Sequence, residues 1–67
     1  MDKDHRPWLP DEIPLAGVRE RSTRTHVLIT VVYDNGLLML GDSRMITAQQ
    51  LLQDFVRLDG SPCGVRI

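Results

Sequence analysis

The chain has 67 residues, a mass of 7.6 kDa, a formal net charge of −1 and a single cysteine, Cys63. This length suits one domain at most, because below ~70–80 residues a single core rarely contributes more than ~3–5 kcal/mol. The balance of eight Lys or Arg with nine Asp or Glu excludes a global electrostatic attraction to nucleic acid or anionic membrane, and one cysteine excludes an internal disulfide framework.

Because the core is small and has no disulfides, we expect self-association or a partner protein to contribute to the stability of the fold. No apolar run approaches the ~18 residues of a membrane span, and the charged segment Met1–Arg6 lacks the apolar region of a signal peptide. We therefore expect a cytoplasmic protein with no membrane partner.

Residues 1–20 form a proline-containing N-terminal arm, which we expect to be extended or partly ordered because proline restricts φ and lacks an N–H donor. Trp8 gives this arm the largest apolar side chain of the sequence. Two interpretations stay open: the arm folds back over the rest of the chain, or it is a docking peptide for a partner. The segment Ile13–Val18 can also add a strand beside the element that follows.

The segment Arg19–His26 is a short basic run that contains Arg19, Arg21 and Arg24. Arginine binds phosphate groups, so these residues are candidate contacts to nucleic acid. Glu20 within the run supports the other interpretation, a solvated connector that leads into a strand.

The segment Thr25–Gly41 predicts a β-hairpin closed by Asn35-Gly36, because this pair tolerates positive φ at both central positions of a type I′ turn. With a two-residue loop, the partners across the hairpin are equidistant from the turn. The predicted pairs are Tyr33–Leu38, Val32–Met39 and Val31–Leu40.

Alternation along both strands divides the hairpin into two faces, and both are apolar. The first face carries Val27, Ile29, Val31, Tyr33, Leu38 and Leu40. The second face carries Leu28, Thr30, Val32, Leu37 and Met39. One helix can cover only the first face, so the second needs a cover from the N-terminal arm, a second copy of the chain or a different protein.

An amphipathic helix is predicted over Thr47–Leu58, where apolar residues recur at helical spacing. These residues are Ala48, Leu51, Leu52, Phe55 and Val56. Thr47 and Gln50 have the spacing of a capping box at the start of the helix. Gly60 is the expected left-handed residue after its end.

The segment Cys63–Ile67 is expected to form a further strand. A right-handed β-α-β return places it parallel to Leu37–Leu40, and pairing with the other hairpin edge is the alternative. The predicted fold class is thus α+β: a small antiparallel, hairpin-based sheet packed against one α-helix, in the order β-β-α-β, with an extra N-terminal strand as a variant. Residues 21–67 form this single ββαβ domain.

Little in the sequence predicts catalysis. His5, His26 and Cys63 are too few and too scattered for a zinc site, and no orienting motif accompanies Cys63 and His26 as a nucleophile and base. The turn Gly41–Arg44 lacks the spacing of a phosphate-binding loop. We expect no enzymatic activity, no metal or cofactor, and no small-molecule substrate, because so short a chain offers little volume for a pocket.

These patterns favour a small protein-interaction module, an inhibitor or adaptor that docks on a larger protein or forms a homodimer through the second hairpin face. Strand addition at an exposed sheet edge is one mode of docking. The candidate partner-binding residues are Trp8, Leu28, Val32, Leu37 and Met39. The alternative is a small nucleic-acid-binding protein that uses a β-ribbon and the basic arm with Arg19, Arg21 and Arg24.

Two short stretches, Val32-Tyr-Asp-Asn-Gly36 and the tail from Leu58 to Ile67, resemble pieces of a small phage-encoded anti-CRISPR family that inhibits a type I surveillance complex. The resemblance implies a phage or mobile-element protein and the inhibitor version of the interaction module. It transfers no site residue to this chain.

Overall fold

The computed structural model describes residues 5–66, which contain seven strands, a short 3-10 turn (Pro10–Glu12) and one α-helix, α1. The strands are β1 His5–Pro7, β2 Gly17–Glu20, β3 His26–Val32, β4 Leu37–Leu40, β5 Met45–Thr47, β6 Phe55–Arg57 and β7 Gly64–Arg66. Helix α1 spans Ala48–Asp54. The predictions that concern residues 1–4 and residue 67 lie outside the described residues.

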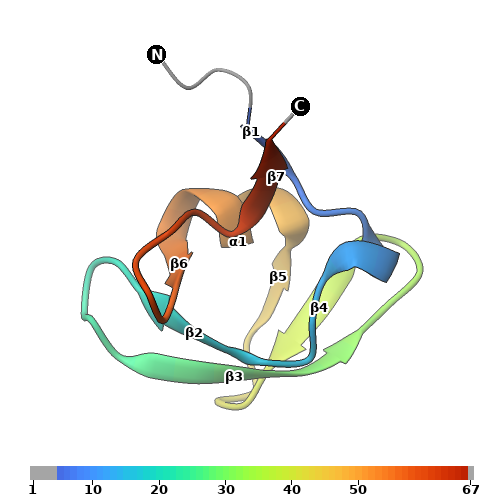
Figure 1. Cartoon of the computed structure of the whole chain (residues 1–67). Helices are drawn as coiled ribbons and strands as arrows, with labels where there is room; N and C mark the ends of the chain where they lie inside the picture. The colour runs from blue at the N-terminus through green and yellow to red at the C-terminus, as the bar shows by residue number, and fades with distance from the viewer. Residues whose placement is uncertain (1–4, 67) are drawn as a thin grey trace.

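Five strands form a curled antiparallel sheet in the order β5-β4-β3-β2-β6, and β1 pairs with β7 in a separate antiparallel sheet. Figure 1 shows the large sheet as a curled layer, with α1 and β7 over its concave side. The predicted α+β class, with a hairpin-based antiparallel sheet and one helix, is confirmed. The order of elements is longer than β-β-α-β, because short strands β5 and β6 flank the helix.

The β3–β4 hairpin exists, but its predicted turn type is wrong. The N–H of Tyr33 donates to the carbonyl of Leu37 at 2.8 Å, so the loop has three residues, Asp34, Asn35 and Gly36. Only Gly36 in this loop has positive φ, at 88°. A type I turn followed by a left-handed glycine explains this geometry. The Asn35 side chain stabilises it by accepting from the Leu37 N–H at 3.1 Å.

The different loop shifts the register by one residue, and a β-bulge between Ile29 and Val31 shifts it by one more, so that Ile29 pairs with Leu40. The observed pairs are Val32–Leu38, Val31–Met39 and Ile29–Leu40, so the predicted pairs are wrong. The bulge also exchanges two side chains between faces: Val31 is exposed, whereas Val32 packs against the core.

The same three-residue turn recurs twice along the chain. The N–H of Leu40 donates to the carbonyl of Arg44, and that of Arg57 to the carbonyl of Ser61, each at 2.8 Å. The left-handed residues of these turns are Ser43 and Gly60. Gly60 therefore closes a turn after β6, and its predicted role as the residue that ends the helix is wrong.

Helix α1 starts as predicted and ends earlier. The Gln50 N–H donates to the Thr47 hydroxyl at 3.1 Å, and the Gln50 side chain accepts from the Thr47 N–H at 3.4 Å, which confirms the capping box. Phe55 is already extended, with φ −128° and ψ 156°. Phe55 and Val56 are both buried, but they belong to β6. Two consecutive apolar residues fit a short buried strand as well as a helix, so helical spacing alone did not distinguish the two structures.

The C-terminal strand also differs from the prediction. β7 pairs antiparallel with β1 and not parallel with β4, so the proposed β-α-β return is wrong. The close pairing needs Gly64, since a Cβ at this position would collide with the carbonyl oxygen of Arg6 and lie 3.0 Å from Leu52 Cδ1.

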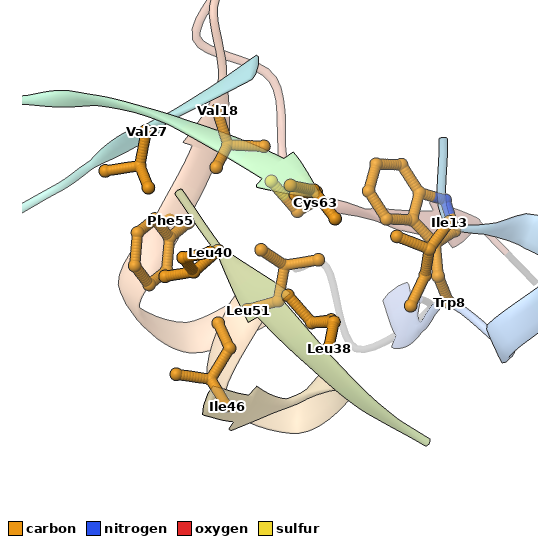
Figure 2. Close-up of a cluster of buried hydrophobic side chains, with 11 residues drawn as sticks. Trp8, Ile13, Val18, Val27, Leu38, Leu40, Ile46, Leu51, Phe55 and Cys63 are labelled. Carbon is orange, nitrogen blue, oxygen red and sulfur yellow. The ribbon is translucent and has the colours of Figure 1, made fainter. Parts of the chain in front are cut away.

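The described part of the N-terminal arm folds back into the domain. Trp8 and Ile13 are buried. An added strand, β2, does lie beside β3, but it spans Gly17–Glu20 and not the proposed Ile13–Val18. Figure 2 shows the Trp8 and Ile13 side chains within the core cluster. The cluster consists of Trp8, Ile13, Val18, Val27, Ile29, Leu38, Leu40, Ile46, Leu51, Phe55 and Cys63. Residues 5–20 thus share one core with the rest of the domain.

Candidate interaction surfaces

The convex side of the large sheet carries a row of apolar side chains that crosses three strands. Val31 of β3 pairs with Met39 of β4, and Met39 pairs with Met45 of β5, so the three side chains point to the same side. Val31 is 41% exposed, Met45 is 48% exposed and Met39 is half-buried. Leu37 follows the same alternation as Met39. We call this set, together with Leu28 of β3, the outer face.

Leu28 belongs to a second apolar contact on the same side of β3, toward β2. It is 64% exposed and pairs with Gly17 of β2. A Cβ on Gly17 would lie 3.5 Å from Leu28 Cδ2 and 3.5 Å from Leu58 Cδ1. Two exposed leucines from β3 and the turn after β6 therefore converge over a glycine, with Leu58 itself 50% exposed.

A groove of about 520 Å³ extends from Gly17 and Leu58 along the end of β2 toward Pro14 and Trp8. Its size lies within the range of ligand and peptide grooves. Its carboxylates are engaged within the fold. Glu12 accepts two hydrogen bonds from Arg6, at 3.2 and 3.0 Å, and Asp59 accepts from Ser61.

The predicted partner-binding residues divide between the outer face and the core. Leu28, Leu37 and Met39 lie on the outer face, whereas the bulge turns Val32 inward. Trp8 is only 4% exposed, and the guanidinium of Arg57 lies 5.0 Å from its ring centroid. Trp8 is therefore a core residue that reaches the surface only at the wall of the groove, and Val32 is a half-buried residue that packs against the core.

Sequence reasoning missed Val31, Met45 and Leu58 as outward-facing apolar residues. The sequence does contain the signal for Met45, which alternates with the buried Ile46 in a short β-branched stretch. Leu58 was assigned to the helix, so its exposed position in a turn was not predicted.

Three arginines surround one hollow on the β2–β6 side of the molecule. Arg19, Arg21 and Arg24 line a cavity of about 300 Å³ together with Val56 and Gly60. The structure thus brings together all three predicted nucleic-acid residues. Among residues 5–66 they form no ion pair with a carboxylate.

Glu20, the carboxylate within the basic run, is paired with another arginine. Arg44 donates to both oxygens of Glu20 and, through Nε, to Asp42 at 2.7 Å. Hydrogen bonds from Arg44 hold the pKa of Glu20 below its ordinary value. Glu20 is therefore ionised and committed to Arg44 at neutral pH, and the hollow keeps its positive charge.

The histidines and the cysteine do not assemble into a reactive site. Within the described residues, no group of three His, Cys, Asp or Glu side chains could hold a metal ion. Cys63 is buried in the core, and this burial raises the pKa of its thiol to about 11. The thiol is protonated at neutral pH, which makes it a poor nucleophile.

The sequence matches no protein-family model, and it has no significant match among curated proteins or solved structures. Over residues 5–66, no helix has the length and apolar character that crossing a membrane requires.

Proposed function

We propose that this protein is a cytoplasmic protein-interaction module, an inhibitor or adaptor that uses the outer face of its sheet to dock on a larger protein or on a second copy of itself. The observation that carries the proposal is the row Val31–Met39–Met45, which places three apolar side chains from adjacent strands at the surface. When a partner covers such a surface, the burial of apolar area stabilises the complex by ~25 cal/mol per Å².

Methionine suits such a surface, because its unbranched side chain adapts to the shape of a partner. The edge strand β5 contributes Met45 to the row and has a partner, β4, on one side only within the large sheet. Strand addition at β5 would therefore place a partner's backbone next to Met45. The proposal requires no enzyme activity, cofactor, membrane or small-molecule substrate.

The nucleic-acid alternative is a second proposal, and the specific observation in its favour is the cluster of Arg19, Arg21 and Arg24. It is the weaker of the two, because it gives no role to the apolar row of the outer face, and among the aromatic residues only His26, which is exposed and pairs with Arg19, lies beside the arginines within residues 5–66. Trp8 and Phe55 are buried, and Tyr33 follows the opposite end of β3.

Affinity capture from the native host's lysate, combined with light scattering of the pure protein, tests the proposed function. We expect either one stoichiometric protein that survives nuclease and high salt, or a dimer of the pure chain. Capture that disappears on nuclease treatment or falls steeply with salt would contradict the proposal and support nucleic acid.

A further inference from the structure

We infer that the partner contributes a segment that combines apolar and acidic side chains, with its apolar part on Leu28 and Leu58 and its carboxylates in the hollow of Arg19, Arg21 and Arg24. This inference rests on the proposed function, and it adds the chemistry of the partner.

The apolar contact and the arginine hollow are neighbours on one face of β2. Gly17 and Arg19 are two residues apart in this strand, so they point to the same side and lie about 6.6 Å apart. Leu28 pairs with Gly17 and converges with Leu58 over it. One short extended segment can therefore contact the leucines and reach the hollow.

The hollow continues directly from this contact. Val56 of β6 pairs with Arg19, and Gly60 follows in the turn after β6. A Cβ on Gly60 would lie 3.9 Å from the Arg19 guanidinium, which places that group at the wall of the hollow. Arg21 is held nearby by a hydrogen bond of 3.4 Å from its guanidinium to the carbonyl of Leu52. All three arginine residues line the hollow, and the guanidinium of Arg19 lies at its wall.

The charge of the hollow calls for an anion from outside the chain. Three guanidiniums repel one another, and Glu20, the carboxylate inside the same basic run, is committed to Arg44. Guanidinium and carboxylate form paired, charge-assisted hydrogen bonds, which become stronger when a partner excludes water from them.

A protein carboxylate fits this surface better than a nucleic-acid phosphate does. Next to the hollow lie one exposed imidazole, His26, which pairs with Arg19, and two exposed leucines, Leu28 and Leu58. The leucines pair with apolar side chains of a peptide, whereas a phosphate backbone gains nothing from them. The net charge of −1 also gives no general attraction to a polyanion, so the positive charge acts only locally. Acidic and apolar side chains on one segment match both parts of the surface.

Selection from a displayed library of random peptides on the full-length protein tests the inference. We expect the enriched peptides to contain Asp or Glu close to Leu, Ile or Phe. A synthetic copy of the most enriched peptide should then bind the double variant Arg19→Gln/Arg24→Gln about tenfold or more weakly, as measured by fluorescence anisotropy. Leu28→Asp should lower the affinity for the same peptide to a similar extent.

The control is the double variant Gln49→Glu/Gln53→Glu, which changes the net charge by −2 on the exposed face of α1, the same change as in Arg19→Gln/Arg24→Gln. We expect its affinity for the peptide to stay within about twofold of the wild type. All the substituted side chains are partly or fully exposed, and unchanged thermal melts will show that the variants fold.

The inference would be overturned if no peptide is enriched, or if the enriched peptides lack acidic residues. It would also be overturned if the peptide binds Arg19→Gln/Arg24→Gln as tightly as it binds wild type. A fourth contrary result is that wild type and the control variant bind a random single-stranded RNA and Arg19→Gln/Arg24→Gln does not. Peptides that depend on Leu28 and not on the arginines would overturn the inference and leave the proposed function intact. Peptides that depend on neither would overturn the inference, and they would contradict the proposed function as well if Met39→Asp leaves their affinity unchanged.

Discussion

The guanidinium of Arg44 donates to both carboxylate oxygens of Glu20, at 3.2 and 3.0 Å, and so joins the turn after β4 to the end of β2. The same guanidinium lies 5.7 Å from the ring centroid of Phe55 on β6. Through the ion pair and the ring contact, Arg44 connects the turn between β4 and β5 at one end of the curled sheet with β2 and β6 at the other. It also removes Glu20 from the arginine hollow.

This pair predicts a dependence of stability on acid pH. Because Arg44 lowers the folded-state pKa of Glu20, the unfolded state binds the proton more readily. The contribution of the pair to stability is complete above the ordinary glutamate pKa of about 4.5 and is lost as the pH falls through the folded value. Urea unfolding should show wild type more stable than Glu20→Gln at pH 7, with the difference shrinking at pH 3. An equal difference at both pH values would contradict the assignment.

Gly64→Ala should destabilise the protein by about 1–3 kcal/mol, because the added methyl would collide with the backbone oxygen of Arg6 and press on Leu52. Gly17→Ala is the matched control, since its Cβ would meet only ordinary contacts at 3.5 Å. Thermal and urea unfolding of both variants measure the difference. If Gly64→Ala is as stable as Gly17→Ala, the pairing of β1 with β7 is incorrect.

Thr47→Ala should cost about 1 kcal/mol, because it removes the hydroxyl that accepts from the Gln50 N–H at the start of α1. Thr25→Ala is the control, since Thr25 is exposed and its hydroxyl takes part in no hydrogen bond. Urea unfolding provides the free energies, and a cost for Thr25→Ala equal to that for Thr47→Ala would argue against the cap.

The β-bulge predicts opposite results for two neighbouring valines. Val32→Asp should destabilise by about 2 kcal/mol or more, because it places a carboxylate against the core. Val31→Asp should cost about 1 kcal/mol or less, because Val31 is exposed on the outer face. Urea unfolding of the two variants decides the register. Under the register predicted from the sequence, Val31→Asp would be the more damaging change.

Local signals in the sequence predicted the features that depend on neighbouring residues. The Thr47 and Gln50 pair predicted the start of the helix, because a capping box needs only residues three apart. The apolar run around Asn35-Gly36 predicted the hairpin. It did not predict the loop type, since the same glycine serves a type I′ turn and a left-handed position after a type I turn.

Features that depend on tertiary packing were not predictable in this way. The bulge beside Ile29 reverses the faces of Val31 and Val32, so alternation alone assigned Val32 to the wrong side. Phe55 and Val56 fit the helical period, but pairing with β2 makes them a strand.

The candidate site was predictable to the same extent. Strand alternation placed Leu28, Leu37 and Met39 on the second face of the predicted hairpin, and all three lie on the outer face of the structure. The three arginines were evident as a basic run, but the hollow also needs Val56 and Gly60 from β6 and its turn, which are distant in the sequence.

The most direct test of the interaction module compares the captured material of three baits: wild type, Met39→Asp on the outer face, and Gln49→Asp on the exposed side of α1. We predict that the partner, or a second copy of the chain, is retained by wild type and Gln49→Asp after nuclease and high salt, and is lost from a folded Met39→Asp. Equal capture by all three baits would contradict a docking role for the outer face.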